Sequence, residues 1–239
     1  MILGAKVVVV VPAFEEASRI ARVIASMPAA VDHVVVVDDA SHDHTADAAT
    51  RAGDVRVEVI VHATNRGVGA AIVTGYQRAL ALTSSPRDVF VVMAGDGQMH
   101  PDDLPAVALP VVRGEADYVK GDRFADDDVA RVMPRGRLVG GKVFSWLTSR
   151  AIGIPISDSQ CGYTALARAA CARLDLDDLW PRYGYPNDLL SQLALRNLRI
   201  AHARVRPVYA DEVSRLRLSH LPRIGQLLAR AWLRRMRAR

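Results

Sequence analysis

The sequence predicts an α/β fold: a Rossmann-like, doubly wound and mostly parallel sheet with helices on both faces. Three observations lead to it. Runs of β-branched residues alternate with segments of helical spacing through the first half of the chain, as in right-handed strand–helix–strand units. The first run, up to Val11, is continuously β-branched, which is typical of a strand covered on both faces. Polar or glycine residues follow each run, at the sheet edge where such folds bind ligands.

The first half of the chain contains four predicted strands and three predicted helices. The opening strand is the run KVVVVV, and the helix after it places Ile20, Val23, Ile24 and Met27 on one stripe. A glycine-rich turn precedes the third helix. We expect strands over residues 6–11, 33–37, 55–61 and 89–93, and helices over residues 15–27, 44–52 and 67–83.

The second half is less regular. We expect strands at 118–121 and 199–205, helices at 136–152 and 188–198, and a mobile charged loop at 125–137. The apolar side of the first of these helices is formed by Val139, Val143, Phe144, Leu147 and Ile152. We divide the chain into one domain over residues 1–215 and a basic amphipathic C-terminal helix over 216–239.

Composition excludes several classes of protein. The chain has 239 residues, a formal charge of +5 and two cysteines, too few for a disulfide framework, and ten-residue spacing without a paired histidine does not suit a zinc site. The N-terminal apolar run is too short for a signal peptide, and no stretch approaches the ~18 apolar residues of a membrane span. We therefore expect a cytoplasmic protein that is soluble or peripheral on the inner face of the membrane.

The C-terminal segment is basic, since no acidic residue follows Glu212. From Leu221 to Arg239 an apolar side bearing Trp232 alternates with arginines, which suits an anionic membrane surface. A helix packed on the domain with a solvated arginine face is an equal alternative. Nucleic acid is disfavoured as a partner, because no aromatic stacking platform accompanies the arginines.

Two of the predicted sheet-edge loops could contact a nucleotide. Asp38 and Asp39 directly follow the second strand, where a carboxylate can accept hydrogen bonds from a base or a ribose; the alternative is an N-cap for the next helix. Residues 65–70, NRGVGA, open the third helix and could present free N–H groups to a phosphate. Structural glycines explain that second loop equally well.

Residues 94–100, AGDGQMH, follow the fourth strand. Asp96 on such a loop could hold Mg²⁺ or Mn²⁺ against a diphosphate, because hard cations take oxygen ligands and share them with substrate phosphates. Gln98 offers a further carbonyl oxygen. The cation would neutralise charge on a leaving diphosphate; a turn stabilised by one carboxylate is the alternative.

Two later segments carry polar residues that could have a function. Residues 157–163, SDSQCGY, form a polar loop that includes Asp158, or simply a turn. Asp188 lies at the start of a predicted helix. It could deprotonate or orient an acceptor as a general base, or cap the helix, and the sequence favours neither.

Taken in order, these motifs resemble family 2 glycosyltransferases of the GT-A fold, and the pattern is most similar to dolichol-phosphate and polyprenyl-phosphate sugar synthases. The resemblance covers roughly residues 6–215. It rests on PAFEE at 12–16, VDDAS at 37–41 with Asp43 and Thr45, N-x-G-x-G at 65–69, GDGQ at 95–98, and the loop at 158–163.

The resemblance implies an inverting transferase that uses a UDP- or GDP-sugar and a divalent cation, Mg²⁺ or Mn²⁺. The acceptor would be a lipid phosphate. By match to the family's motifs, the cation and diphosphate would be held by Asp96 and Gln98, and Asp188 would lie near the acceptor. The implied nucleotide-sugar contacts are Pro12, Phe14, Glu16, Asp39, Gly67, Gly69, Asp96 and Arg123, and the implied acceptor contacts are Asp158 and Arg215.

One departure from the family pattern bears on function. The family usually has Asp-x-Asp at the metal loop, and Ala94 stands at the first of these positions. Two alternatives therefore stay open beside a lipid-phosphate transferase. One is a soluble transferase acting on a small-molecule hydroxyl, and the other is a nucleotide-binding protein with reduced or no transferase activity.

Overall fold

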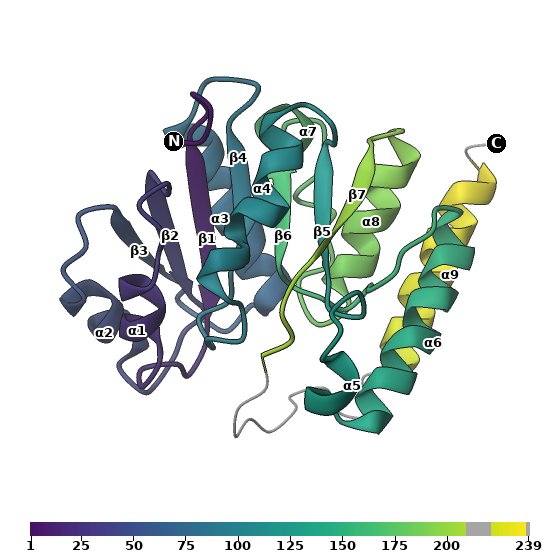
Figure 1. Ribbon diagram of the computed structural model, residues 1–239, viewed down its shortest axis with the longest axis horizontal. Coiled ribbons are helices and arrows are strands. Elements are labelled where there is room, and N and C mark those ends of the chain that lie inside the picture. Colours follow the sequence, from purple (N-terminus) through teal and green to yellow (C-terminus); the bar gives the residue numbers. More distant parts are fainter. Residues whose placement is uncertain (209–220, 238–239) are drawn as a thin grey trace.

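The computed structural model describes residues 1–208 and 221–237, and within them seven strands form one sheet in the order β3-β2-β1-β4-β6-β5-β7 (Figure 1). Only β6 runs antiparallel to its neighbours β4 and β5, so the predicted α/β fold with a mostly parallel sheet is confirmed. The strands are β1 Val7–Ala13, β2 His33–Asp38, β3 Val57–Val61, β4 Val89–Val92, β5 Tyr118–Asp122, β6 Thr164–Ala167 and β7 Ile200–Arg204.

Helices cover both faces of the sheet because the strands alternate their side chains between two apolar layers. Val7, Val9 and Val11 of β1 belong to the layer under α1 and α4, whereas Val8 and Val10 belong to the layer under α3 and α8. The helices are α1 Ile20–Ala25, α2 Thr45–Arg51, α3 Val68–Leu82, α4 Leu104–Val112, α5 Val129–Val132, α6 Arg135–Ile152, α7 Arg168–Cys171, α8 Tyr185–Leu195 and α9 Leu221–Arg237, with a short 3₁₀ turn η1 at Pro101–Asp103.

Several predicted boundaries were wrong for identifiable reasons. Strand β1 continues through Pro12 to Ala13, because the proline carbonyl still accepts a hydrogen bond, from the N–H of Gly95 at 3.1 Å. The structure also contains α4, β6 and α7, which we did not predict. Helix α4 has Pro105 in its first turn, where proline is tolerated, and Pro110 in its interior, where a proline argues against a helix in a sequence.

The segment predicted as a mobile loop is ordered. Residues 125–137 contain α5 and the start of α6. Asp126 is buried and accepts a hydrogen bond from Nε of Arg204 at 3.2 Å, while Asp127 pairs with the same guanidinium at 2.9 Å. The charges that suggested a solvated loop therefore attach this segment to β7.

The predicted core side of helix α6 is only partly correct. Val139, Val143 and Leu147, expected to face the core, are exposed, whereas Ile152 is buried as predicted. The buried face carries Ser145, Thr148, Ala151 and Ile152. The hydroxyl of Thr148 donates to Oδ1 of Asn187 on α8 at 3.0 Å, so the inner side of α6 is held by polar contacts.

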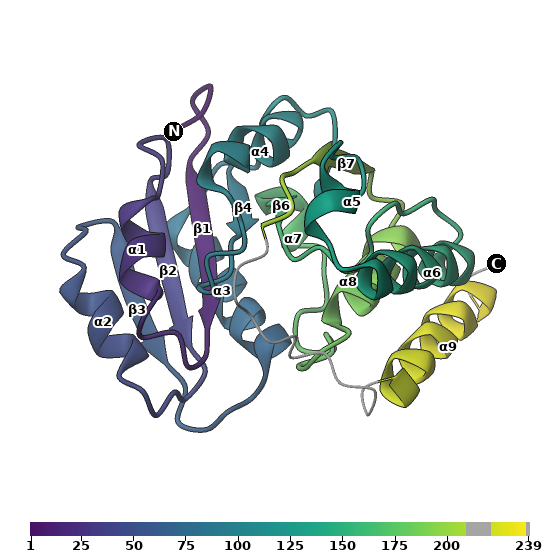
Figure 2. The same ribbon diagram turned by 60° about the horizontal axis from the view of Figure 1, so that its bottom comes forward.

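Helix α9 packs against α6 and α8 at one side of the molecule (Figure 2). Leu227 and Ala231 are buried there, so part of its apolar side covers the domain. Among the described residues, no helix is both long enough and apolar enough to cross a membrane.

Candidate functional site

The carboxyl ends of β1, β2 and β4 are joined at one edge of the sheet. The N–H of Asp39 donates to the carbonyl of Ala13 at 2.9 Å, and the N–H of Gly95 donates to the carbonyl of Pro12 at 3.1 Å. Three loops that the sequence singled out therefore begin side by side. This is the edge at which parallel α/β sheets bind ligands.

The loop after β1 is fixed to the loop after β2. Glu15 has a positive φ of 56°, and its N–H donates to Oγ of Ser41 at 2.9 Å. The N–H of Glu16 donates to Oγ1 of Thr45 at 2.9 Å. The Glu16 carboxylate is buried against the guanidinium of Arg19 at 2.9 Å. Phe14 lies half-buried at the same turn, so this predicted nucleoside-contacting segment is rigid.

Asp39 is buried and organises the neighbouring loop. One of its carboxylate oxygens accepts from Nδ1 of His62 at 2.7 Å and from the N–H of Arg66 at 2.9 Å, and the other accepts from the N–H of Gly67 at 2.6 Å. Nε2 of His62 is in turn 2.9 Å from Oγ1 of Thr74. Two carboxylate oxygens offer about four acceptor sites, so a ligand N–H or hydroxyl can still be added to these three bonds.

Gly67 and Gly69 do not form the open phosphate cradle that the sequence suggested. The N–H of Ala70 donates to the carbonyl of Pro181 at 3.0 Å, and the N–H of Gly67 is already bonded to Asp39. The start of α3 is therefore covered by the segment before α8. Both glycines are required by this close approach, since a Cβ on Gly69 would lie 2.2 Å from the carbonyl oxygen of Trp180 and one on Gly67 would lie 2.6 Å from that of Pro181.

We therefore expect Gly69→Ala to lower the free energy of unfolding by about 3 kcal/mol, because the added methyl group meets backbone that cannot rotate away. Urea denaturation followed by circular dichroism measures this. Gly140→Ala is the matched control, because its Cβ would meet nothing within 4 Å and alanine is favoured inside a helix by about 0.5–1 kcal/mol. Equal stability of Gly69→Ala and the parent protein would contradict the close packing.

The loop after β4 carries Asp96 at its turn. Oδ1 of Asp96 accepts from the N–H of Gln98 at 3.0 Å, and Gly97 between them has a φ of +77°. Both side chains are half-exposed. The described residues contain no group of three or more histidine, cysteine, aspartate or glutamate side chains that could hold a metal ion. Asp96 and Gln98 carry side-chain oxygen atoms, the ligand type that hard cations take.

The loop at 158–163 contacts this metal loop. Oη of Tyr163 donates to the carbonyl of His100 at 3.2 Å. Burial raises the pKa of Tyr163 far above its usual value, so the phenol stays a proton donor. A Cβ on Gly162 would lie 2.9 Å from the methyl group of Met99. The structure therefore brings together two motifs that are sixty residues apart in the chain.

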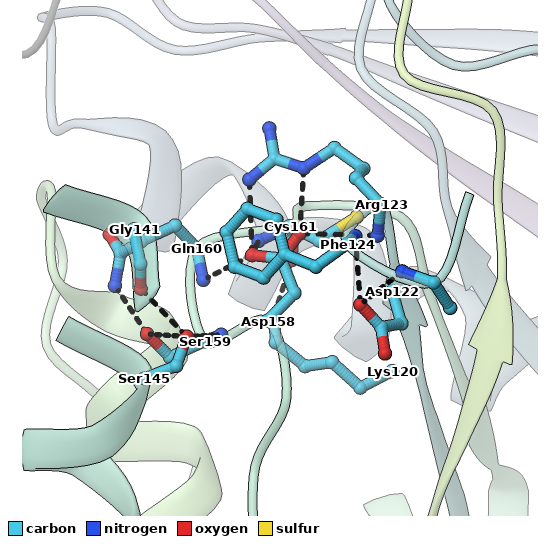
Figure 3. Close-up of polar contacts among 11 residues, drawn as sticks. Lys120, Asp122, Arg123, Phe124, Gly141, Ser145, Asp158, Ser159, Gln160 and Cys161 are labelled. Carbon is cyan, nitrogen blue, oxygen red and sulfur yellow. Dashed lines mark hydrogen bonds and ion pairs between the residues drawn. The ribbon is translucent and has the colours of Figure 1, made fainter. Parts of the chain in front are cut away.

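Asp158 holds Arg123 in a bidentate ion pair (Figure 3). Nε of Arg123 is 2.7 Å from Oδ2 of Asp158, and Nη2 is 3.1 Å from Oδ1. Asp158 is completely buried, whereas Arg123 is about a quarter exposed, with 23% of its side-chain surface accessible. A planar guanidinium held by two parallel hydrogen bonds to one carboxylate has a fixed orientation. Asp158 thus orients Arg123.

A buried lysine supports the same loop. Nζ of Lys120, which is fully buried, donates to the carbonyl of Cys161. Desolvation lowers the pKa of Lys120, and the nearby Cys161 and Asp158 oppose that effect. The N–H groups of Gln160 and Cys161 donate to Oδ1 of Asp158 at 3.2 and 3.1 Å. Sequence analysis missed Lys120, which gave no local signal in the apolar run of β5.

Asp188 lies in the first turn of α8 and is 2% exposed. Oδ2 accepts from the backbone N–H of Trp180 at 2.9 Å, and Oδ1 accepts from Nη1 of Arg234 on α9 at 2.8 Å. The Trp180–Pro181 segment is the one that covers the start of α3. Arg215, the other predicted acceptor contact, lies outside the described residues.

The chain is similar in sequence to known proteins. The family model described as Glycosyl transferase family 2 matches residues 8–175. An uncharacterised protein of Methanocaldococcus jannaschii is 29% identical over 207 residues, which cover 86% of this chain and 83% of that protein. A UDP-N-acetylglucosamine–dolichyl-phosphate N-acetylglucosaminyltransferase of Methanococcus voltae is 27% identical over 217 residues, covering 84% of this chain and 85% of that protein.

The fold is also found among solved structures. Glucosyl-3-phosphoglycerate synthase from Mycobacterium tuberculosis, in complex with Mn²⁺, uridine diphosphate and glucosyl-3-phosphoglycerate, has a TM-score of 0.70 and 23% sequence identity. The match covers 97% of this chain and 80% of that one. At this identity the likeness shows the shared architecture.

Proposed function

The chain belongs to glycosyl transferase family 2 and is a glycosyltransferase with the GT-A fold, and from that premise we propose that it transfers a sugar, with inversion, from a UDP- or GDP-sugar to a polyprenyl phosphate. The proposal of a nucleotide-sugar donor is supported mainly by one observation: the loops after β1, β2 and β4 meet at one edge of the sheet. The name of the Methanococcus voltae relative, which includes a UDP-sugar and dolichyl phosphate, supports both substrates.

The nucleoside would lie on the rigid loops after β1 and β2. Pro12, Phe14 and Glu16 would line it, and Asp39 would accept a hydrogen bond from the base or the ribose. Because Asp39 is already held by three donors, it meets the ligand in a fixed position, which lowers the entropy cost of binding.

The proposed cofactor is Mg²⁺ or Mn²⁺, and the residues present fit a cation that the donor completes. Asp96 is a single carboxylate and Gln98 a single amide oxygen. Such cations are commonly held by one or two carboxylates together with substrate phosphates and water. When bound, the cation supplies positive charge to the leaving diphosphate. That an M. tuberculosis enzyme of this fold was crystallised with Mn²⁺ and UDP supports the proposal.

Arg123, which Asp158 fixes by two hydrogen bonds, would contact a phosphate of the nucleotide sugar, and the acceptor phosphate would lie near the Asp158 loop. A phosphate oxygen forms the bond to the anomeric carbon while the bond from that carbon to the diphosphate breaks, so the configuration inverts. A phosphate oxygen is already ionised and needs little deprotonation, so Asp188 would orient the acceptor rather than remove a proton. A hydroxyl acceptor would need Asp188 as a base.

We also propose that the protein works in the cytoplasm, peripherally on the inner face of the membrane, where a lipid phosphate is accessible. Leu221 to Arg239 is the segment that would make that contact; packing on the domain is the equal alternative that the sequence left open. Its basic residues suit anionic lipid headgroups.

Calorimetric titration with UDP and with GDP, each with and without Mn²⁺, tests the donor side. We expect one nucleotide to bind at least about tenfold more tightly when Mn²⁺ is present, because diphosphate and Asp96 share the cation. Mn²⁺ alone should bind weakly. Binding that ignores Mn²⁺ would favour the second candidate, a nucleotide-binding protein without transfer, which Ala94 motivates; no binding of either nucleotide would contradict the proposal.

A further inference from the structure

Helix α6 exposes large apolar side chains on its outer side. Val139 and Trp146 are 63% and 62% exposed, and Val143 lies between them, also exposed. These positions are spaced four and three residues apart, so they lie on one side of the helix. Over residues 139–148 the buried positions of α6 are Ser145 and Thr148, so large apolar side chains of this part of the helix face solvent.

Helix α9 extends this surface. It lies beside α6 in both ribbon views (Figures 1 and 2), and Nη1 of Arg235 donates to the carbonyl of Arg150 at 3.2 Å where the two helices meet. Trp232, Leu233 and Met236 are each about half exposed, at 50%, 47% and 50%. Two adjacent helices thus each expose large apolar side chains, and exposed apolar patches on soluble proteins mark interaction sites.

The surface formed by α6 and α9 is basic as well as apolar. Neither helix contains an aspartate or a glutamate. On α6, Arg135, Lys142 and Arg150 are exposed, and their spacing relative to Val139 and Trp146 places them on the same outer side. Lysine and arginine can extend past apolar neighbours and keep their charges in a polar layer.

We infer that the α6–α9 surface docks on an anionic lipid bilayer, with Trp146 and Trp232 in the interfacial layer and the basic side chains among the headgroups. Tryptophan prefers that interface, and a helix with one apolar and one basic side binds in its plane. A second copy of the chain is the competing occupant. A symmetric dimer would place this basic surface against itself, so its charges oppose that arrangement, whereas anionic lipid complements them.

Docking in this orientation would bring the membrane to the acceptor side of the molecule. Helix α9, which presents Trp232, also carries Arg234, whose guanidinium contacts Asp188. The inference rests on the proposed function in one respect: a lipid-linked acceptor would explain why the α6–α9 surface lies near Asp188. Membrane binding itself is measured without substrate.

The test is flotation with vesicles of phosphatidylcholine containing phosphatidylglycerol. The parent protein should float, and less so in high salt or with phosphatidylcholine alone. Trp146→Gln should weaken partitioning by about tenfold or more, because one large apolar side chain no longer enters the bilayer. Val61→Gln is the matched control, since Val61 is 58% exposed on β3, far from this surface, and it should float like the parent.

A site-specific signal accompanies flotation. The variant Trp180→Phe/Trp232→Phe keeps Trp146 alone, and its fluorescence should shift to shorter wavelength when anionic vesicles are added. No shift, or equal flotation of Trp146→Gln and the parent, would overturn the inference. So would a dimer, seen by light scattering, that Trp146→Gln dissociates. UDP titration of the same samples reports separately on the proposed donor site.

Discussion

Asp96→Asn is expected to abolish the Mn²⁺ dependence of UDP binding and to lower the rate of sugar transfer by about 10²–10³-fold. Asp96 is the acidic side chain on the turn after β4, with Gln98 bonded to it through its backbone N–H. Asparagine can still accept that hydrogen bond, so the turn should survive. What is lost is the negative charge that holds the cation against the leaving diphosphate.

Two measurements separate this effect from a general loss of structure. Calorimetry with UDP should show the same affinity with and without Mn²⁺ in Asp96→Asn, and circular dichroism should show an unchanged fold. Asp102→Asn is the matched control, because Asp102 is an exposed carboxylate on the following turn, with 74% of its side-chain surface accessible. If both variants retained full Mn²⁺-dependent transfer, Asp96 would not be the metal-binding residue.

The parallel strands could be predicted from the sequence, whereas β6 could not. Strands β1, β2 and β4 are valine-rich because helices cover both of their faces, and an uninterrupted apolar run is the mark of such strands. Strand β6 is four residues, Thr164–Ala167, without a β-branched run. It is a strand because β4 and β5 pair with it on either side, and tertiary context of this kind overrides weak local propensity.

Periodicity found α6 but not its orientation. A stripe of apolar residues shows that a helix has two sides, and it does not tell which side the rest of the protein covers. On the covered side of α6, Ser145 and Thr148 form hydrogen bonds with other segments. The N–H of Ser159 donates to Oγ of Ser145 at 2.9 Å, and Thr148 bonds to Asn187. These hydrogen-bond partners belong to segments outside α6, so the local sequence pattern does not predict them.

Part of the candidate site could be predicted from the sequence, and part of it could not. Asp39 and Asp96 could be predicted because each follows a strand, and the carboxyl ends of parallel strands meet at one edge. The pair of Arg123 with Asp158 joins residues 35 apart in the chain, and the pair of Arg234 with Asp188 joins residues 46 apart. Side-chain pairing over such separations depends on how the elements pack.

Asp188→Asn is expected to lower the turnover number for transfer by about 10²–10⁴-fold if a hydroxyl is the acceptor, and by less if a phosphate is, because only the former needs a proton removed. Asparagine keeps the size of the side chain and can accept the N–H of Trp180. Affinity for UDP should be unchanged. Turnover measured with a polyprenyl phosphate and with a small-molecule hydroxyl acceptor therefore reports both the role of Asp188 and the acceptor class. The structure does not support Asp188 as a helix cap, because the N-cap of α8 is Gly184. Full activity with both acceptors would show that Asp188 only holds the Trp180 segment and Arg234 in place.

Arg234 offers a sharper version of the same experiment, because the chain contains a matched partner. Both Arg234 and Arg230 on α9 pair with Asp178, but of the two only Arg234 is bonded to Asp188 in the described structure. Arg234→Gln should lower the turnover number by about ten- to a hundredfold, since an acceptor-orienting group displaced by even an ångström loses that much. Its affinity for UDP should be unchanged, and Arg234→Lys should restore part of the rate.

Arg230→Gln removes a comparable surface ion pair, which is worth at most about 1 kcal/mol, and should leave turnover unchanged. If the two glutamine variants lost activity equally, the effect would come from α9 docking as a whole, and Arg234 would have no separate role in positioning Asp188.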